Sequence, residues 1–263
     1  MISAKSQREI KTMKQAGKIV ALARQACADA LKPGITTEQL DRIAEEVIRA
    51  QGATPSFKGY GGFPGTICAS INSELVHGIP NQTVLKNGDI ISIDIGACYN
   101  GYHGDASWTF PVGEISDDNK RLLEVGRQAL FAGLEQAKPG NHLGDISHAI
   151  GEFIDLHGYS FPFDLTGHGI GTHLHEEPAI PNFGEAGTGL LLEEGMTFAI
   201  EPIVLAGKPH TKVLADDWTV VTKDGSLAAH FEHTIVITKD GYEILTINHD
   251  EEENSIYGKT RCH

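Results

Sequence analysis

Apolar residues recur at helical spacing in two stretches of the chain that lie 106 positions apart. The first stretch contains Leu40, Ile43, Ala44, Val47 and Ile48, and the second contains Ile146, Ala149, Ile150, Phe153 and Ile154. This i, i+3, i+4, i+7, i+8 spacing predicts an amphipathic helix in each stretch. Both helices follow a Lys-Pro-Gly turn, and Gly52 and Gly158 are expected to end them. Thr36 and Gln39 have the spacing of a capping box at the start of the first.

A further helix is expected before each Lys-Pro-Gly turn. Ser6 and Glu9 have the spacing of a capping box, which predicts a helix that runs from there toward Ala30. Ser116 or Asp117 is expected to cap the corresponding helix in the second half of the chain. Each half of the chain therefore begins with a helix, a turn and a second helix.

Short apolar runs after these helices predict strands, and the strands also repeat. The apolar run that ends at Asp94 resembles the run that ends at Glu201, which aligns these two carboxylates. A histidine followed two positions later by an acidic residue leads to Asp105 in one half and to Glu232 in the other. Each half is therefore expected to contribute two carboxylates at matching places.

This internal repetition predicts the organisation of the whole chain. We expect two pseudo-repeats, at about 6–110 and 116–248, joined by a hinge near Pro111–Ser116. Repeats that cannot each bury a core are expected to pack together around a pseudo-twofold axis. Residues 1–263 are therefore expected to form a single catalytic domain, with its site between the halves.

The segment Tyr99-Asn100-Gly101-Tyr102 predicts a β-hairpin, because Asn-Gly accepts the positive φ angles of a type I′ turn. This turn would pair Asp94 with Ser107. Asp105 would then lie on the same face as Asp94, as a diagonal neighbour roughly 7–8 Å away. The two carboxylates could bind a common metal ion or pair of ions.

Five residues are predicted to hold two divalent metal ions: Asp94, Asp105, His168, Glu201 and Glu232. Asp94 and Glu201 lie in apolar runs, where an unpaired charge is costly and a cation would compensate it. Carboxylates with one imidazole suit Co, Mn, Fe or Zn. Two such ions can activate a bridging water and polarise a carbonyl, so we expect a hydrolase.

Other interpretations of these residues exist. The carboxylates could be solvated positions on surface strands, although the apolar neighbours of Asp94 disfavour this. The glycine-rich loop around His168 could cradle a phosphate, but no Lys or Ser/Thr partner follows it.

Two more histidines lie in segments that align with each other, with His77 matching His175 and Pro80 matching Pro178. Either histidine alone would be a structural residue on the simplest interpretation. Together they indicate one imidazole from each half beside the metal ions, able to hydrogen-bond a scissile carbonyl or a substrate nitrogen.

The chain has 263 residues and a formal net charge of −14, from 21 basic and 35 acidic residues. This balance argues against nucleic acid or an anionic membrane as a partner. The four cysteines form no Cys-X-X-Cys pair, which is typical of reduced thiols in a cytosolic protein. Neither a signal-peptide pattern nor a membrane-spanning apolar run is present, so we expect a soluble, cytoplasmic protein. No Gly-X-Ser-X-Gly elbow or activated cysteine indicates a covalent nucleophile.

The segments around the predicted ligands are similar to those of the methionine aminopeptidase family: NGYHGD at 100–105, GHGIGTHLHEEP at 167–178 and FAIEP at 198–202. The resemblance covers nearly the whole chain. It implies the pita-bread fold, an α+β fold in which two pseudo-symmetric halves share a central curved antiparallel sheet. His175 and Glu201 are only 26 positions apart, which leaves no room for a type II insert. The chain begins without a zinc-finger extension, so it resembles the bacterial type I enzymes.

The resemblance also implies a role for each ligand. Asp94 would chelate one ion, and Asp105 and Glu232 would bridge both. His168 and Glu201 would complete the other ion, and Glu201 would carry the water's proton to the leaving amine. The implied reaction is removal of the N-terminal methionine from nascent proteins and peptides, by a hydroxide bridging two divalent metal ions. His77 and His175 would contact the substrate near the scissile peptide bond.

Six residues match positions that would line an apolar methionine pocket: Phe57, Tyr60, Phe63, Cys68, Leu174 and Trp218. The chain departs from the family pattern at some of them. Phe57 stands where a smaller residue, often Cys, is common, and Leu174 stands where an aromatic residue is common. Gly96 stands where Thr can occur. We expect the large Phe57 to narrow the pocket.

The resemblance implies N-terminal Met peptides and nascent chains as partners, and a monomer is the simplest expectation. The ribosome is a further partner compatible with nascent-chain work, although no motif indicates it. Proline-specific pita-bread peptidases share the ligand order but usually carry a large N-terminal domain. Non-catalytic pita-bread binding proteins have typically lost ligands, and amidinohydrolases of this fold work without metal. Both are disfavoured because all five ligands are present.

Overall fold

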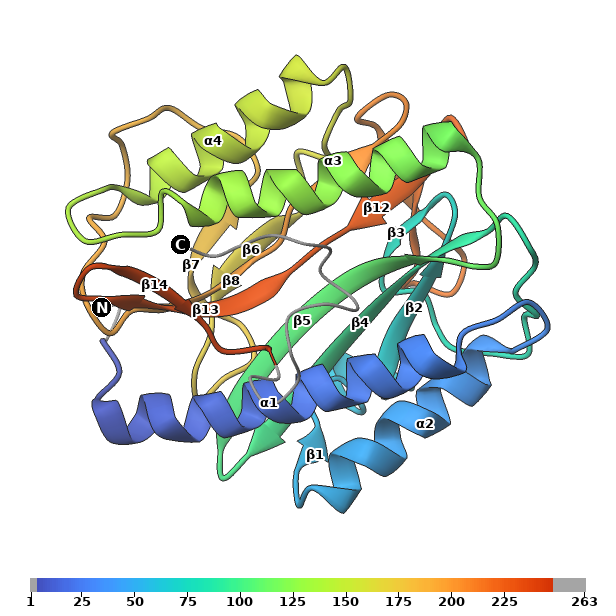
Figure 1. Ribbon diagram of the computed structural model, residues 1–263, viewed down its shortest axis with the longest axis horizontal. Helices are drawn as coiled ribbons and strands as arrows, with labels where there is room; N and C mark the ends of the chain where they lie inside the picture. The colour runs from blue at the N-terminus through green and yellow to red at the C-terminus, as the bar shows by residue number, and fades with distance from the viewer. Residues whose placement is uncertain (1–3, 248–263) are drawn as a thin grey trace.

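Four α-helices form two packed pairs, with α1 beside α2 and α3 beside α4, in the computed structural model, which describes residues 4–247 (Figure 1). The four are α1 (Gln7–Ala30), α2 (Thr37–Ala50), α3 (Asp117–Leu134) and α4 (Leu143–Leu156). The capping boxes at Ser6 and Thr36 and the cap at Ser116 form as predicted. Gly52 and Gly158 follow α2 and α4 with φ angles of 75° and 78°, as the helix-ending prediction requires.

The first half of the chain forms a four-stranded antiparallel sheet from β1 (Thr54–Pro55), β2 (Ile67–Ile71), β4 (Ile90–Tyr99) and β5 (Tyr102–Pro111). β4 is central, because it pairs with β5 along one edge and with β1 and β2 along the other. The β4–β5 hairpin turns at Asn100 and Gly101, whose φ angles are 48° and 82°. Asp94 pairs with Ser107, so the predicted hairpin register is confirmed.

The second half forms a five-stranded antiparallel sheet in the order β14 (Gly241–Ile244), β13 (His233–Thr238), β8 (Thr197–Ile200), β6 (Thr166–Gly169) and β7 (Glu176–Pro181). Two small sheets complete the strands. One pairs β12 (Ala228–His230) with β9 (Ile203–Leu205), and the other contains β10 (Thr211–Val213), β11 (Val220–Thr222) and β3 (Glu74–Val76). A short 3-10 helix, η1, covers Tyr60–Gly62. The β3–β11 pairing joins a strand of the first half to a strand of the second.

The two large sheets repeat one arrangement. β4 lies between β2 and β5, and β8 lies between β6 and β13, with antiparallel pairing throughout and the same chain order. A single cluster of buried apolar side chains draws on both halves, including Ile93, Leu130, Ile150 and Phe198. The predicted α+β class with two similar halves is therefore present.

The strand register corrects one of the two predicted alignments. In the first half Asp94 faces Ser107, and Asp105 lies two positions from Ser107. In the second half the paired residues on either side place Glu201 directly opposite Glu232. The register therefore does not satisfy both predicted alignments, Asp94 with Glu201 and Asp105 with Glu232, at the same time. Similar letters suggested the two alignments, whereas backbone pairing between strands sets the register.

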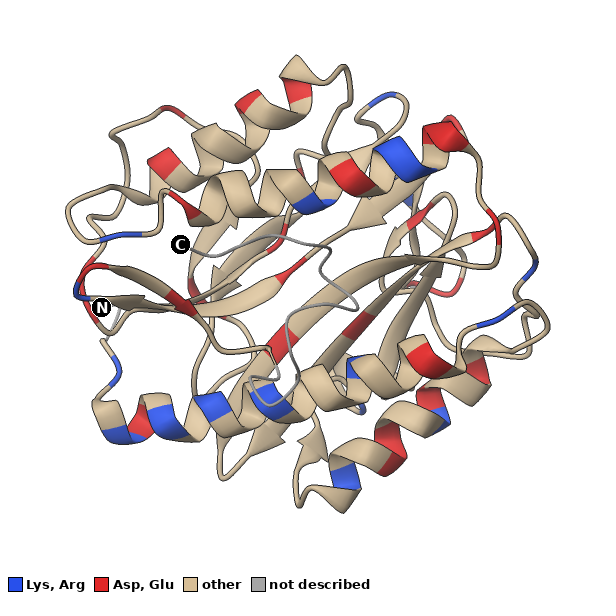
Figure 2. Cartoon of the chain, viewed as in Figure 1, with Lys and Arg blue, Asp and Glu red and all other residues tan. Residues whose placement is uncertain are grey.

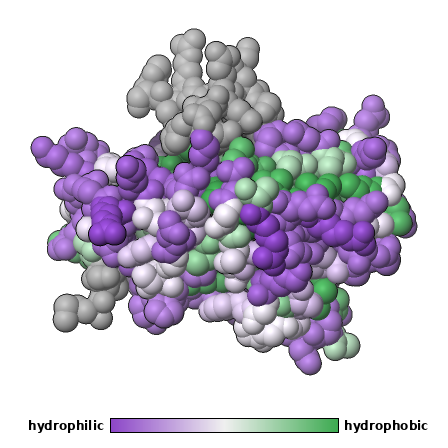
Figure 3. Space-filling view, turned by 90° about the horizontal axis from the view of Figure 1, so that it is seen from below, coloured by the Kyte–Doolittle hydropathy of each residue, from purple (hydrophilic) through white to green (hydrophobic). Residues whose placement is uncertain are grey.

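Charged residues are distributed unevenly over the fold. In Figure 2 they lie mostly along the helices and loops, but acidic positions also interrupt strands in the middle of the molecule. The face in Figure 3 is largely hydrophilic, with apolar residues gathered in one broader area at its upper right. Among residues 4–247, no helix is long and apolar enough to cross a membrane.

Candidate metal centre

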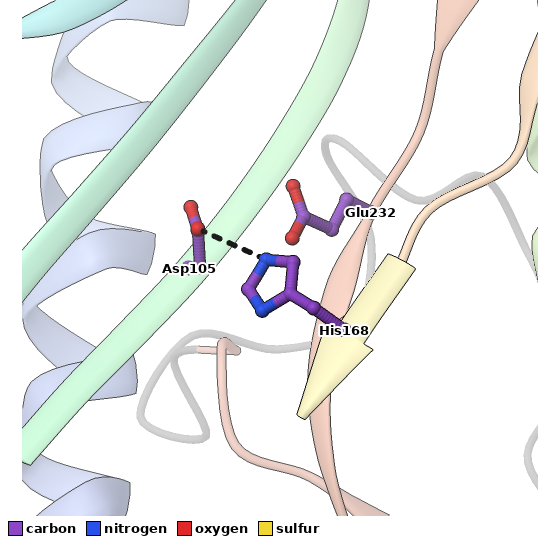
Figure 4. Close-up of side chains that lie close together, drawn as sticks. All are labelled: Asp105, His168 and Glu232. Carbon is purple, nitrogen blue, oxygen red and sulfur yellow. Dashed lines mark ion pairs between the residues drawn. The ribbon is translucent and has the colours of Figure 1, made fainter. Parts of the chain in front are cut away.

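The predicted ligands come together from strands of both halves. Asp94 lies on β4 and Asp105 on β5, while His168 lies on β6. Glu201 follows β8 directly, and Glu232 lies between β12 and β13. Asp105, His168 and Glu232 each offer a ligand atom within 4.8 Å of the others, and Figure 4 shows their side chains converging. Residues that are far apart in the chain therefore meet at one site.

His168 connects this triad to Glu201. Its Nε2 atom lies 3.9 Å from Oδ2 of Asp105 and 3.6 Å from Oε1 of Glu201. The other ring nitrogen, Nδ1, lies 2.8 Å from the carbonyl oxygen of Gly169. A carbonyl can only accept, so Nδ1 carries the proton and Nε2 presents its lone pair to the carboxylates. This is the tautomer that a metal ligand requires.

The carboxylates are buried without enough hydrogen-bond partners. Asp105 and Glu232 are 3% and 2% exposed. Oδ1 of Asp94, Oδ1 of Asp105 and Oε1 of Glu232 have no hydrogen-bond partner. Buried charges without partners are costly, and a cation relieves that cost. The oxygen-rich donor set with one imidazole therefore fits divalent metal ions.

Burial also shifts the pKa of each ligand. Desolvation raises the pKa of Asp94 to about 6 and that of Glu201 to about 8. Desolvation and then repulsion by Asp94 and Glu201 raise the pKa of Asp105 well above its usual value. Desolvation, and then repulsion by the neighbouring carboxylates, also raises the pKa of Glu232 well above its usual value. Like charges this close disfavour full ionisation, and a divalent cation would reverse that preference.

His175 and His77 lie beside this cluster. The ring of His175 is 4.3 Å from the ring of His168, and its Nδ1 lies 2.8 Å from the hydroxyl of Tyr60. The ring of His77 is 6.3 Å from that of Trp218. His77 has a φ of 59°, a left-handed conformation that is uncommon outside glycine and clusters at functional sites. Burial lowers the pKa of His77 to about 4, so its ring is neutral at neutral pH.

Most of the predicted pocket residues belong to one buried apolar cluster: Phe57, Phe63, Cys68 and Leu174, with Trp218 packed against them. Phe63 and Trp218 meet edge to face at 5.1 Å. Tyr60 is more exposed and lies over His175, with its ring 5.1 Å away. Cys68 pairs with Asp94 in the β2–β4 ladder, and burial raises the pKa of its thiol well above the usual value. The structure thus places a buried apolar cluster next to the carboxylates.

Sequence reasoning missed one residue of the centre. His230 is 2% exposed, and its Nε2 lies 3.5 Å from Oε2 of Glu201. The available signal was its position two residues before Glu232, which puts both side chains on one face of the strand.

The chain matches known proteins over nearly its whole length. Residues 11–239 match the model of metallopeptidase family M24. The chain is 56% identical over 246 residues to methionine aminopeptidase 1 of Bacillus subtilis (strain 168), which covers 94% of this chain and 99% of that protein. It is 41% identical over 252 residues to methionine aminopeptidase of Escherichia coli (strain K12), covering 95% and 96%.

Solved structures show the same relationship. Methionine aminopeptidase from Thermotoga maritima has a TM-score of 0.93 and 46% identity, covering 94% of this chain and 100% of that one. Prolidase from Pyrococcus furiosus has a TM-score of 0.75 and 25% identity, covering 93% of this chain but 65% of that one. The predicted pita-bread fold and the resemblance to bacterial type I enzymes are confirmed.

Proposed function

Because the chain belongs to the methionine aminopeptidases of metallopeptidase family M24, we propose that it removes the N-terminal methionine from peptides and nascent proteins. The observation that carries this proposal is the buried group of Asp105, His168 and Glu232, whose ligand atoms converge beside an apolar cluster. Hydrolysis then occurs at the metal centre, and the methionine side chain is selected in the pocket beside it.

We propose that two divalent ions of Co, Mn, Fe or Zn are held by the five predicted ligands. Asp94 would hold one ion and His168 with Glu201 the other, while Asp105 and Glu232 would lie between them. This division follows the family resemblance, and the tautomer of His168 supports it. When bound, such ions supply an activated water and polarise the scissile carbonyl.

Glu201 is the residue that moves the proton. Its carboxylate lies next to His168 through Oε1, at the edge of the cluster. Burial raises its pKa to about 8, so its affinity for a proton suits exchange near neutral pH. Glu201 would accept the proton of the attacking water and deliver it to the leaving amine.

His175 and His77 would position the substrate. Nδ1 of His175 lies 2.8 Å from the hydroxyl of Tyr60, and a bond donated by that hydroxyl would leave the ring proton on Nε2. That N–H can donate to the carbonyl oxygen as negative charge develops there. His77 would contact the peptide on the other side, against Trp218. The apolar cluster of Phe57, Phe63, Cys68, Leu174 and Trp218 would receive the methionine side chain.

The cellular setting of this activity is also a proposal. We expect a cytoplasmic monomer that forms one catalytic domain and meets nascent chains near the ribosome. The net charge of −14 supports the exclusion of nucleic acid as a partner.

Restoration of activity after metal removal tests the proposed function. The chelated protein should regain release of methionine from Met-Ala-Ser on addition of Mn, Fe, Co or Zn, with no comparable cleavage of an X-Pro dipeptide. The X-Pro substrate is the relevant control, because proline-specific enzymes share the fold. Preferential cleavage of the X-Pro dipeptide, or activity indifferent to chelation, would contradict the proposal.

A further inference from the structure

His230 is a fully buried imidazole that points at the carboxylates of the candidate centre. Its Nε2 lies 3.5 Å from Oε2 of Glu201 and 3.9 Å from Oε2 of Glu232. Neither Nδ1 nor Nε2 of this ring has a hydrogen-bond partner. Buried polar atoms are nearly always paired in native proteins, so two unpaired nitrogens in one ring call for an explanation.

The strand register gives His230 a defined place in the duplicated fold. His230 pairs with Ile203, two positions beyond Glu201. In the first half, Asp105 pairs with Gly96, two positions beyond Asp94. With Asp94 taken as the counterpart of Glu201, His230 stands where the other half has a candidate metal ligand, and its side chain faces the same centre.

The backbone of His230 is anchored to the first half of the chain. The hydroxyl of Thr109 donates to the carbonyl oxygen of His230 at 2.9 Å, and the N–H of His230 donates back to that hydroxyl at 2.8 Å. The hydroxyl of Ser92 lies 2.9 Å from the same Thr109 oxygen. These bonds fix the backbone that carries the ring of His230 beside the cluster.

The carboxylate of Glu201 lies between two imidazoles. Its Oε1 faces Nε2 of His168 at 3.6 Å, and its Oε2 faces Nε2 of His230 at 3.5 Å. Nε2 of His168 carries a lone pair and no proton, so it cannot donate a hydrogen bond to Oε1 of Glu201. That oxygen is therefore left for a cation. Of the two imidazoles, only that of His230 can donate a hydrogen bond to Oε2 of Glu201. A shift of a few tenths of an ångström brings Nε2 of His230 to the usual hydrogen-bond distance from that oxygen.

We propose that His230 is a positioning residue of the metal centre, whose Nε2–H donates to Oε2 of Glu201 and keeps Oε1 turned toward the ions. Residues that hydrogen-bond to metal-ligating side chains orient them, and their loss typically costs 10–100-fold in metal affinity or activity. The catalytic part of this inference rests on the proposed function, whereas the metal-binding part does not.

Three substitutions at this position separate the possible roles. Leu removes the donor while keeping an apolar side chain, and Asn has an amide that is too short to reach Glu201. Gln places an amide N–H at about the reach of Nε2. We expect His230→Leu and His230→Asn to bind Co²⁺ about 10–100-fold more weakly than the unmodified protein by calorimetry, and His230→Gln to restore the affinity to within a few-fold.

Kinetics and spectroscopy give independent readouts. With saturating Co²⁺, His230→Leu should lower kcat on Met-Ala-Ser and leave KM little changed, because Glu201 rather than the pocket is disturbed. The visible absorption of bound Co²⁺ should be the same in His230→Gln as in the unmodified protein, because the ligands are unchanged. If Met-Ala-Ser is not cleaved at all, the proposed function fails while the Co²⁺ affinities still test His230.

His233→Leu is a matched control, because His233 is also buried and begins the next strand, β13, but faces Trp108 and Thr246 rather than the carboxylates. It should lower the melting temperature while leaving Co²⁺ affinity within a few-fold. Two outcomes would overturn the proposal. Weak Co²⁺ binding by His230→Gln, together with an altered Co²⁺ spectrum, would make His230 a direct ligand. Normal Co²⁺ affinity in His230→Leu would make His230 a core residue without this role.

Discussion

At the scale of single residues, Phe57 and Gly96 share one space in the pocket. A Cβ atom at residue 96 would lie 2.7 Å from Cε1 of Phe57 and 2.8 Å from Cβ of Ser56. A side chain at residue 96 would therefore meet both Phe57 and Ser56. Two positions at which the chain is expected to depart from the family pattern are thus neighbours in the structure.

This coupling predicts the behaviour of a double mutant. Gly96→Thr alone should destabilise the protein by about 1–3 kcal/mol through overpacking against Phe57. Phe57→Cys alone should widen the pocket and raise KM for Met-Ala-Ser. The double mutant should be more stable than the sum of the single effects predicts, with a coupling of about 0.5–3 kcal/mol in urea unfolding. Additive stabilities, or unchanged kinetics in Phe57→Cys, would show that the residues act separately.

The proton-transfer role of Glu201 is a second prediction at this scale. Glu201→Gln keeps the shape of the side chain but cannot accept a proton, so kcat should fall by about 10²–10⁴-fold at saturating metal, with little change in KM. Glu194→Gln, on an exposed residue nearby in the chain, is the control and should retain full activity. Steady-state kinetics on Met-Ala-Ser measure both, and near-normal kcat in the Glu201→Gln variant would remove Glu201 from this role.

At the scale of elements, the β4–β5 hairpin determines where Asp94 and Asp105 lie. Both strands are ten residues long and pair along their full length, so the turn sets the register of both carboxylates. This register could be predicted because the turn signal is local: only two residues had to adopt positive φ angles. The helix starts could be predicted for the same reason, since each cap involves residues three positions apart.

The turn itself can be tested at Gly101. Its φ is 82° and no atom lies within 4 Å of the position that a Cβ would take, so a substitution there meets strain but no clash. Gly101→Val should therefore destabilise the protein by about 1–2 kcal/mol, whereas Gly101→Asn should cost less because Asn tolerates this conformation. Urea unfolding compares the two. Equal stability of Gly101→Val and Gly101→Asn would argue against a type I′ turn.

At the scale of the whole molecule, the carboxylate cluster links stability to metal and to pH. Without metal, the pKa of Glu201 in the folded state is raised to about 8, above its value of 4.5 in an unfolded chain. A raised pKa stabilises the fold at low pH, and this contribution is lost as pH rises through the folded value. The lowered pKa of a buried histidine such as His168 changes stability in the opposite direction, because stability then falls as pH falls. This effect operates only below about pH 6.5, the usual pKa of histidine.

The chelated protein should therefore lose stability as pH rises from about 6.5 to about 8, between the range in which the histidines titrate and the folded pKa of Glu201. The melting temperature measured with EDTA should fall over this range, and Glu201→Gln should show a smaller fall. A divalent metal should raise the melting temperature most at the upper end, because metal requires the ionised carboxylates and stabilises only the folded state. A melting temperature without metal that climbs steadily from about pH 6.5 to about pH 8 would contradict this linkage.

Features that depend on residues close together in the chain could be predicted from the amino-acid sequence alone. These are the helix starts and ends, the β4–β5 hairpin and the presence of carboxylates in apolar strands. The sequence also predicted the ligand set and the pocket residues, because the motifs around Asp94, Asp105 and Glu201 resemble those of a known family. The structure brings Asp105, His168 and Glu232 together, as that resemblance implies.

The way in which the two halves meet became visible in the three-dimensional structure alone. Glu201 faces Glu232, His230 points into the cluster and Tyr60 lies over His175. Sequence similarity gave two alignments that the strand register does not satisfy together, because it cannot count the hydrogen-bonded pairs of a ladder. Contacts such as Tyr60 with His175 join residues 115 positions apart. Their geometry depends on strand register and on packing of one half against the other, and a local pattern contains neither.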